Sequence, residues 1–165
     1  MTGEDRLYAD LTALGISYDV AEHEAVFTVE ESHALHELLP GAHTKNLFLK
    51  DGGGQFWLVT VPAEARVDLK ALPSAIGSKR ISFGKAEDIE RLLGISPGSV
   101  TPLAAINDAD GHVKVVLDAA FEGRINVHPL RNTATLGLAT VDLIRALRHW
   151  GHDPIIATIP TLEAV

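Results

Sequence analysis

The chain has 165 residues, of which 46% are hydrophobic and 22% are charged, a balance typical of one globular domain, residues 1–165, that buries a core. It has no cysteine, which excludes thiol catalysis, disulfides and cysteine-based zinc sites and suits a reducing cytoplasm. The formal net charge of −8 argues against binding nucleic acid over a broad surface, although a local basic patch is compatible with it. We expect no signal peptide, because the N-terminus is acidic and amphipathic, and no membrane-spanning helix, because no apolar run is long enough.

The N-terminal part of the chain predicts a helix, a strand and a second helix. Leu7, Leu11 and Leu14 recur at helical spacing before a glycine, so we expect the first helix to end there. Apolar and polar residues alternate over residues 16–20, which predicts a half-buried strand. A capping box precedes residues 29–38 and a proline follows them, which predicts the second helix.

The middle of the chain predicts a hairpin and two further helices. Asn46–Leu49 and Gln55–Val61 are apolar strands joined by the turn sequence DGGG. A short helix is expected over residues 68–76, with Asp68 as its cap, and a short strand over Arg80–Phe83. A helix over Ala86–Leu93 is closed by the next glycine.

The C-terminal part predicts four strands and a last helix. Val100–Ile106 and His112–Leu117 are expected to form a hairpin through the turn NDADG. Strands are also expected over Arg124–Val127 and Thr133–Leu138, and a helix capped by a threonine over Val141–Trp150. Strands and helices do not alternate as in βαβ proteins, so the pattern favours an α+β fold with a mainly antiparallel, barrel-like sheet flanked by helices.

Two segments carry candidate chemistry on this scaffold. In TKNLFLKD, residues 44–51, Lys45 lies at the start of an apolar strand, where a lysine is usually an exposed strand-end residue. In PGSVTPLAAIND, residues 97–108, Gly98 to Pro102 form a G-x-x-x-P loop, which alone is a common turn. Glycine lets backbone N–H groups approach a ligand and proline fixes the loop exit, so the two segments together predict a small polar pocket without a side-chain nucleophile.

These two segments, with RINVHPLRNTATLGL at residues 124–138, resemble the YbaK/ProX family of aminoacyl-tRNA deacylases, which are related to the editing domain of bacterial prolyl-tRNA synthetase. The third segment is similar to the branch that edits alanyl-tRNA-Pro. The resemblance extends from the first helix to about Pro160. It implies a mixed sheet curled into a partial barrel and hydrolysis of a mischarged tRNA ester without a cofactor.

The resemblance also implies roles for single residues. Lys45, Gly98 and His128 are the expected catalytic residues, with the ammonium of Lys45 stabilising charge or holding the tRNA end and the loop at Gly98 offering backbone N–H groups. For His128, lining the pocket, binding the substrate amine and orienting a water all stay open, and we favour positioning over general-base catalysis. The expected substrate-binding residues are Thr44, Asn46, Ser99, Val100, Thr101, Pro102 and Asn126.

Neither hydroxyl in the loop is expected to act as a nucleophile. No acidic residue stands beside Ser99 or Thr101 to complete a hydrolase triad. Lys50 and Arg80 are the candidates for contacting the acceptor stem of tRNA-Pro, on charge and position alone.

The histidines that precede the first of these segments are candidate metal ligands. His33 and His36 are spaced to share a helix face and His43 follows, but no further ligand with recognised spacing does, so no metal is expected. Phe27, Val29 and Leu35 would instead pack the expected helix over the pocket as a lid.

The sequence thus favours a cytoplasmic deacylase that hydrolyses alanyl-tRNA-Pro in trans, with at most weak association with prolyl-tRNA synthetase. A synthetase pocket cut for proline cannot strongly reject a smaller amino acid, since a missing methylene is worth only about 1–3 kcal/mol, and a second, smaller site is the general remedy. The alternatives are editing of cysteinyl- or seryl-tRNA-Pro, hydrolysis of a D-amino acid ester, and a module that binds tRNA or other nucleic acid without chemistry.

Overall fold

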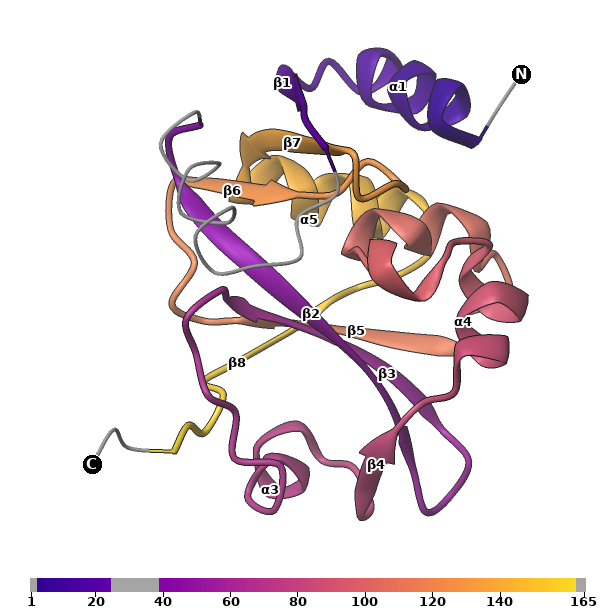
Figure 1. Ribbon diagram of the computed structural model, residues 1–165, viewed down its shortest axis with the longest axis vertical. Helices are drawn as coiled ribbons and strands as arrows, with labels where there is room; N and C mark the ends of the chain where they lie inside the picture. The colour runs from indigo at the N-terminus through magenta and orange to yellow at the C-terminus, as the bar shows by residue number, and fades with distance from the viewer. Residues whose placement is uncertain (1–2, 25–38, 163–165) are drawn as a thin grey trace.

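The computed structural model describes residues 3–24 and 39–162, which build helices around one eight-stranded mixed sheet (Figure 1). The strands are β1 Tyr18–Glu22, β2 Ala42–Asp51, β3 Phe56–Pro62, β4 Ile81–Phe83, β5 Val113–Asp118, β6 Arg124–Val127, β7 Ala134–Ala139 and β8 Ile155–Ala157. The helices are α1 Gly3–Ala13, α3 Leu72–Ile76, α4 Ala86–Leu93 and α5 Thr140–His149, with the 3₁₀ turns η1 Pro97–Ser99 and η2 Pro102–Asn107.

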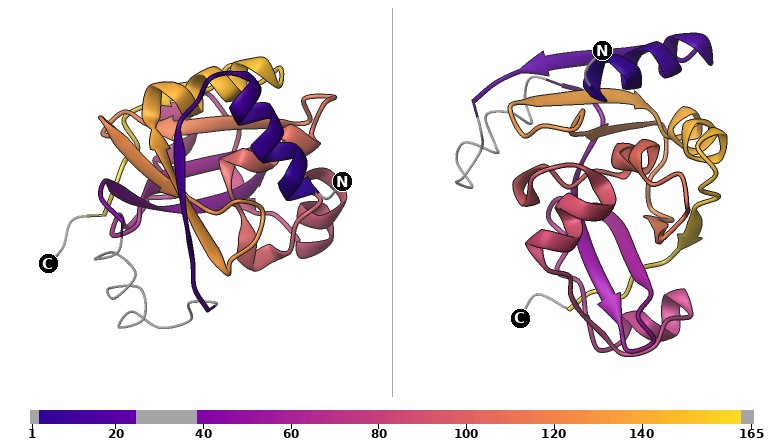
Figure 2. Two further views of the ribbon diagram at one scale, coloured as in Figure 1. Left: turned by 90° about the horizontal axis from the view of Figure 1, so that it is seen from above. Right: turned by 90° about the vertical axis from the view of Figure 1, so that its right-hand side faces the viewer.

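The strands follow the order β1-β7-β6-β2-β3-β5-β8, and β4 pairs with β2 beside this path. Pairs β1–β7, β6–β7, β2–β3 and β2–β4 are antiparallel, whereas β2–β6, β3–β5 and β5–β8 are parallel. The predicted α+β fold with a mixed sheet flanked by helices is therefore confirmed (Figures 1 and 2). Strand β2 connects the two halves of the sheet, because its first residues pair with β6 and the rest pair with β3.

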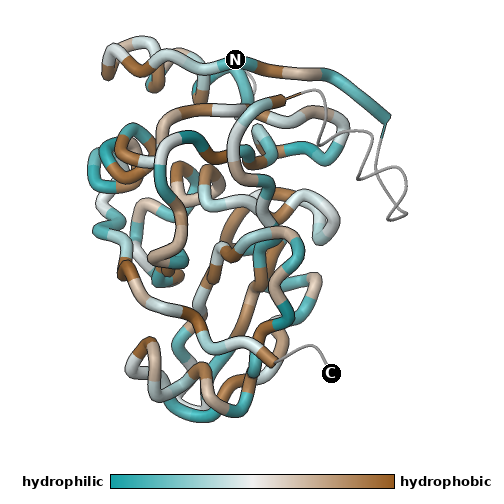
Figure 3. The backbone as a smooth tube through the Cα atoms, turned by 90° about the vertical axis from the view of Figure 1, so that its left-hand side faces the viewer, coloured by the Kyte–Doolittle hydropathy of each residue, from teal (hydrophilic) through white to brown (hydrophobic). Residues whose placement is uncertain are grey.

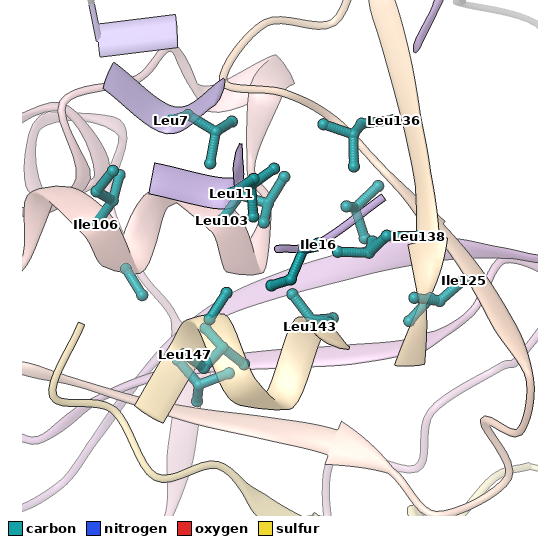
Figure 4. Close-up of a cluster of buried hydrophobic side chains, with 14 of the residues drawn as sticks. Leu7, Leu11, Ile16, Leu103, Ile106, Ile125, Leu136, Leu138, Leu143 and Leu147 are labelled. Atoms are coloured by element: carbon teal, nitrogen blue, oxygen red, sulfur yellow. The ribbon is translucent and has the colours of Figure 1, made fainter. Parts of the chain in front are cut away.

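The largest core cluster lies between α1, α5, η2 and the β6–β7 half of the sheet. Leu7 and Leu11 from α1 meet Leu136 from β7 and Leu143 from α5, and all four are fully buried (Figure 4). Their spacing along α1 is the helical stripe that the sequence predicts. Burial of each such side chain stabilises the fold by roughly 1.5–3 kcal/mol, so this cluster fixes the sheet half that carries β6.

The other half of the sheet is buried on both faces, which explains the apolar composition of its strands. Alternation along β2 sends Phe48 to the side of α4 and Leu49 to the side of α3. On β3, Leu58 and Val59 divide between the same two faces. Figure 3 shows hydrophobic segments recurring along these inner strands.

Most predicted elements are confirmed within the described residues. The helices expected at the N-terminus, over Ala86–Leu93 and near the C-terminus form as α1, α4 and α5. The hairpin through DGGG is β2–β3, with Asp51 turning the chain. The carboxylate of Asp68 caps the turn just before α3 by accepting from the N–H groups of Lys70 and Ala71.

The predicted strand over Val100–Ile106 is wrong, and so is its hairpin with the next strand. The Thr101 hydroxyl accepts from the N–H of Leu103 and Pro102 fixes the next φ, so the chain starts the 3₁₀ turn η2 instead. The following turn is held by Asp108, whose carboxylate accepts from the N–H groups of His112 and Val113. Strand β5 then pairs in parallel with β3 and β8.

Smaller differences concern the C-terminal region and the second predicted helix. Strand β8 is not predicted from the sequence, because it has three residues and its periodicity is too short to register. Thr140 is the first residue of α5 rather than its cap, and its buried hydroxyl has no partner. The helix predicted over residues 29–38 and the predicted lid residues Phe27, Val29 and Leu35 lie outside the described residues.

Candidate active site

A small cavity lies where β2 parts from β6. The two strands pair only through Ala42–Ile125 and His43–Asn126, after which β2 turns to pair with β3 from Thr44 onward. The fork leaves a cavity of about 50 Å³ between the strands. It is lined by His43, Thr44, Asn126, Val127, His128 and Thr135. Three of the residues expected from the sequence, Thr44, Asn126 and His128, are therefore brought together.

Thr44 and Asn126 hold the fork together with their polar atoms. The Thr44 hydroxyl donates to the Asn126 carbonyl oxygen at 2.7 Å, and the Asn126 side-chain amide donates to the carbonyl oxygen of Pro40 at 3.0 Å. The Asn126 Oδ1 atom is buried and has no hydrogen-bond partner among the described residues. An unpaired buried acceptor costs about 1–3 kcal/mol, so this atom is either a weakness of the fold or a ligand contact.

His128 presents a lone pair at the cavity. Its Nδ1 donates to the Ala134 carbonyl oxygen at 2.9 Å, so in the neutral ring Nε2 is the acceptor. Burial lowers the pKa of His128 below its usual value, the bond to Ala134 acts in the opposite direction, and nearby His23 lowers the pKa further. No described residue bonds to Nε2, so a neutral His128 is equipped to accept a proton donor from a ligand.

Gly137 has no Cβ, and this leaves room for the side chains of Asn126 and Arg124. A Cβ at Gly137 would lie 2.6 Å from Asn126 Oδ1 and 3.0 Å from Arg124 Nη2, closer than real Cβ contacts come. Arg124 donates to the Gly137 carbonyl oxygen at 3.1 Å and forms an ion pair with Asp19, while its Nε is buried and unpaired. Glycine in TATLGL is thus a packing requirement of the site.

Lys45 and Asn46 follow Thr44 on β2 but do not line the cavity. Alternation places Lys45 on the same face as His43, and its ammonium makes no hydrogen bond or ion pair with the described residues. Asn46 lies on the opposite face, where its Oδ1 accepts from the buried hydroxyl of Thr60 at 2.6 Å. Of these two side chains, only that of Lys45 makes no hydrogen bond or ion pair with the described residues.

The G-x-x-x-P loop uses its hydroxyls internally, and none of its residues, Gly98 to Pro102, lines the cavity. Ser99 bonds to the Ser96 hydroxyl at 2.9 Å, and the Thr101 hydroxyl accepts from Leu103. The N–H groups of Val100 and Thr101 bond to no described residue. Gly98 lies close to the segment that follows His128, since a Cβ on it would be 3.2 Å from the side-chain amide of Asn132.

The segment between His128 and Asn132 is firmly held. Leu130 adopts a φ of 72°, a left-handed conformation that is rare for leucine, and its side chain packs against two core clusters. Arg131 bonds to the carboxylates of Glu4 at 2.5 Å and Glu22 at 2.8 Å, which raises its pKa. These contacts fix the loop that approaches Gly98.

Lys50 and Arg80 lie at the other end of β2. Lys50 lies six positions after Thr44, which is about 20 Å along an extended strand. Lys50 is exposed above the Phe56 ring, 5.3 Å from its centroid, and the Arg80 carbonyl oxygen accepts from the N–H of Gly52 beside it. The structure brings these two cations near each other and away from the cavity.

Sequence reasoning missed two residues of the site and misassigned a third. Thr135 lines the cavity and bonds to His23 at 2.9 Å, and neither was singled out. For Thr135 the signal is alternation, since it lies two residues from Gly137 on β7 and Gly137 pairs with Asn126 on β6. His43 was considered only as a metal ligand, yet it lines the cavity and its Nε2 donates to the Leu39 carbonyl oxygen at 3.2 Å.

Within residues 3–24 and 39–162, no group of three histidine, aspartate or glutamate side chains is placed to hold a metal ion. His33 and His36 lie outside these residues. No helix in the same part of the chain is long and apolar enough to cross a membrane.

The sequence matches known proteins over most of its length. It is 43% identical over 153 residues to prolyl-tRNA synthetase associated domain-containing protein 1 of Bos taurus, covering 88% of this chain and 89% of the relative. It is 34% identical over 155 residues to the prolyl-tRNA editing protein ProX of Acetoanaerobium sticklandii, covering 92% and 94%. The fold is similar to the crystal structure of a candidate trans-editing enzyme for prolyl-tRNA synthetase, with a TM-score of 0.70, 18% identity, and 96% and 98% of the two chains covered.

The family assignment combines these similarities with the site. A sequence model of the aminoacyl-tRNA editing domain matches residues 23–146, which include β2, the G-x-x-x-P loop and β6. The segments that resemble the YbaK/ProX proteins therefore lie inside the matched region. The chain belongs to the aminoacyl-tRNA editing domain family.

Proposed function

We propose that this chain is an aminoacyl-tRNA deacylase, a single domain acting in trans, which hydrolyses alanyl-tRNA-Pro. The observation that carries the proposal is the cavity at the β2–β6 fork, in a chain of the editing family. Its small volume of about 50 Å³ favours a small side chain such as the methyl group of alanine. We expect the bulkier proline to be disfavoured, so that the site acts as the second sieve that a proline-sized pocket needs.

Carbonyl polarisation and positioning carry the reaction. The unpaired N–H groups of Val100 and Thr101 are suited to an oxyanion, and loss of one such donor typically costs about 100- to 1000-fold in rate. The uncommitted ammonium of Lys45 stabilises the same developing charge or holds the terminal ribose and phosphate. An aminoacyl ester is already activated, so water can attack it without a protein nucleophile.

The engaged hydroxyls support this mechanism over a serine-type one. Ser99 is buried and bonded to Ser96, and Thr101 caps η2. Neither is paired with a histidine of residues 3–24 or 39–162, and a nucleophilic hydroxyl requires such a base. The attacking water is instead oriented by the substrate, through the ribose hydroxyl next to the ester, and by the pocket.

Contact with the tRNA is assigned to the basic end of β2. Lys50 and Arg80 are exposed there, about 20 Å along the strand from the cavity, a separation that lets the acceptor stem lie along β2 with its 3′ end at the fork. Few phosphate contacts are needed by a protein that grips one RNA end, which fits the net charge of −8. We place the protein in the cytoplasm, with at most weak association with prolyl-tRNA synthetase.

The test is deacylation of labelled alanyl-, cysteinyl-, seryl- and prolyl-tRNA-Pro and of alanyl-tRNA-Ala by the purified protein. The proposal expects fast loss of alanine from tRNA-Pro, little loss from the other substrates, and at least a 100-fold lower rate in Lys45→Ala. Lys114→Ala, which removes an exposed lysine of β5, is the matched control and is expected to retain the rate. Preference for cysteine or serine would change the substrate, and tRNA binding without hydrolysis of any ester would make the chain a binding module.

A further inference from the structure

Three of the side chains that line the cavity, Thr44, His128 and Thr135, have lone pairs that their own hydrogen bonds leave available, while a fourth, His43, donates through Nε2 to the Leu39 carbonyl oxygen. A hydroxyl that has given its proton to one partner can only accept from another. Thr44 donates its proton to the Asn126 carbonyl oxygen, so the remaining lone pairs of its oxygen are acceptors. His128 donates through Nδ1 to Ala134, which leaves Nε2 as an acceptor in the neutral ring that burial favours.

His23 makes the hydroxyl of Thr135 an acceptor toward the cavity as well. The Nδ1 of His23 lies 2.7 Å from the carbonyl oxygen of Glu24, an atom that can only accept, so Nδ1 carries a proton. In the neutral ring Nε2 is then the acceptor, and the Thr135 hydroxyl, 2.9 Å away, donates to it. Thr135 therefore turns a lone pair, and no proton, toward the cavity that it lines.

Asn126 adds an acceptor that has no partner in the part of the chain that the structure describes. Its Oδ1 is buried and unpaired, while its amide nitrogen is occupied by Pro40. The neighbouring Arg124, whose Nε is also unpaired, does not line the cavity, and its guanidinium is ion-paired with Asp19. A cavity lined by several acceptors attracts a group with several N–H bonds.

We propose that Asn126, His128 and Thr135 form a subsite for the primary α-ammonium of the aminoacyl group, with His23 as the positioning residue that fixes the Thr135 hydroxyl as an acceptor. The inference rests on the proposed function and deepens it by naming the substrate group that the cavity recognises. The three N–H bonds of an ammonium match three acceptors on two adjacent strands. Proline carries a secondary ammonium with two N–H bonds, so this subsite discriminates by donor number as well as by size.

The decisive comparison uses two esters of nearly equal size. Alanyl-tRNA-Pro is treated with nitrous acid to give lactyl-tRNA-Pro, in which a hydroxyl replaces the ammonium. Each enzymatic rate is divided by the uncatalysed rate of the same ester, because the ammonium also activates the ester chemically. Wild type is expected to prefer the alanyl ester by about 100-fold, as two or more charge-assisted hydrogen bonds are lost with lactate.

Variants separate recognition from packing. Thr135→Val keeps the shape and removes the acceptor, so it should slow the alanyl ester about tenfold and leave the lactyl ester unchanged, whereas Thr135→Ser should restore the preference. His23→Phe should reproduce a part of the Thr135→Val effect, since the Thr135 proton is then free to face the cavity. An equal loss on both esters in Thr135→Val would mean that the residue only packs, and would overturn the subsite.

A second readout keeps this inference distinct from the proposed function. Adenosine carrying alanine through a 3′-amide bond cannot be hydrolysed, and its binding is compared with that of the lactyl amide by calorimetry. If wild type hydrolyses both esters equally, the subsite is wrong while the deacylase stands. If it hydrolyses neither ester, the proposed function fails. Tighter binding of the alanyl amide than of the lactyl amide then supports the subsite, and equal binding overturns it.

Discussion

Buried polar groups are hydrogen-bonded at the hairpin end of β2, whereas at the cavity end some have no partner among the described residues. At the far end, the buried Asp51 carboxylate accepts from the indole N–H of Trp57 at 3.0 Å and from the backbone N–H groups of Gly53 at 2.9 Å and Gln55 at 3.1 Å. At the near end, Asn126 Oδ1 is buried without a partner and His128 Nε2 bonds to no described residue. Satisfied groups hold the hairpin, whereas the unsatisfied groups gather where a ligand is to bind.

The difference also appears in how the two ends respond to protons. Burial alone would raise the pKa of Asp51, but its hydrogen bonds outweigh burial and the pKa is lowered. At the cavity, burial is the leading cause and lowers the pKa of His128, so the ring is kept neutral. The hairpin end therefore stabilises the charged form of Asp51, whereas the cavity end favours the neutral form of His128, which keeps a lone pair on Nε2.

The largest expected effect is the loss of stability when the satisfied end is broken. Asp51→Ala leaves three donors around a buried space without their acceptor, so we expect the free energy of unfolding to fall by about 3 kcal/mol. Urea denaturation followed by circular dichroism measures it. Asp110→Ala, at an exposed aspartate, is the control and should change stability by less than about 0.5 kcal/mol.

The same residue gives a pH dependence with a definite sign. Because the pKa of Asp51 is lower in the folded than in the unfolded chain, its contribution is present above the ordinary value of about 3.9 and is lost as pH falls through the folded pKa. The stability difference between wild type and Asp51→Asn should therefore shrink on acidification below about pH 4. A difference that grows there would show that Asp51 is not stabilised as a carboxylate.

The next effect breaks the cavity end through its backbone. Gly137→Ala places a Cβ 2.6 Å from Asn126 Oδ1, so Asn126 must move or the strands must part. We expect a loss of about 2 kcal/mol in stability and a lower rate of deacylation per folded molecule. Gly52→Ala is the matched control, because the nearest atom to its Cβ would be 3.9 Å away. Equal stability of the two variants would contradict the close packing of Asn126 on β7.

The hairpin end of β2 can be predicted from the sequence more fully than the cavity end. The hairpin through DGGG follows from local turn chemistry, so β2, β3 and their register are predictable. Thr44, Asn126 and His128 were found through the resemblance, but Thr135 and His23 were not, since the β6–β7 register and a bond across 112 residues bring them to the site. The strand expected at Val100 failed because a cap at Thr101 outweighed an apolar run.

A pH profile sharpens the comparison at the level of activity. If neutral His128 is the working form, deacylation of alanyl-tRNA-Pro, corrected for uncatalysed hydrolysis, should stay constant through the ordinary imidazole range near pH 6.5 and fall about tenfold per pH unit only below it. His128→Gln should be slower and lack this acid limb. A midpoint above 6.5, or a limb that persists in the variant, would assign the titration to another group.

The smallest effect concerns Asn46, which lies between the two ends and shows features of both. Its Oδ1 accepts from the fully buried Thr60 hydroxyl at 2.6 Å, so the pair is satisfied like Asp51 although its neighbours belong to the candidate site. Thr60→Val keeps the shape and removes the donor, and we expect about 1 kcal/mol of lost stability in urea denaturation. If Asn46 serves only to brace β2 against β3, the deacylation rate of folded Thr60→Val stays at the wild-type value. If Thr60 instead holds the Asn46 amide toward the tRNA end, the rate falls while stability changes little, and Asn46 would then be grouped with the unsatisfied, ligand-binding end of the strand.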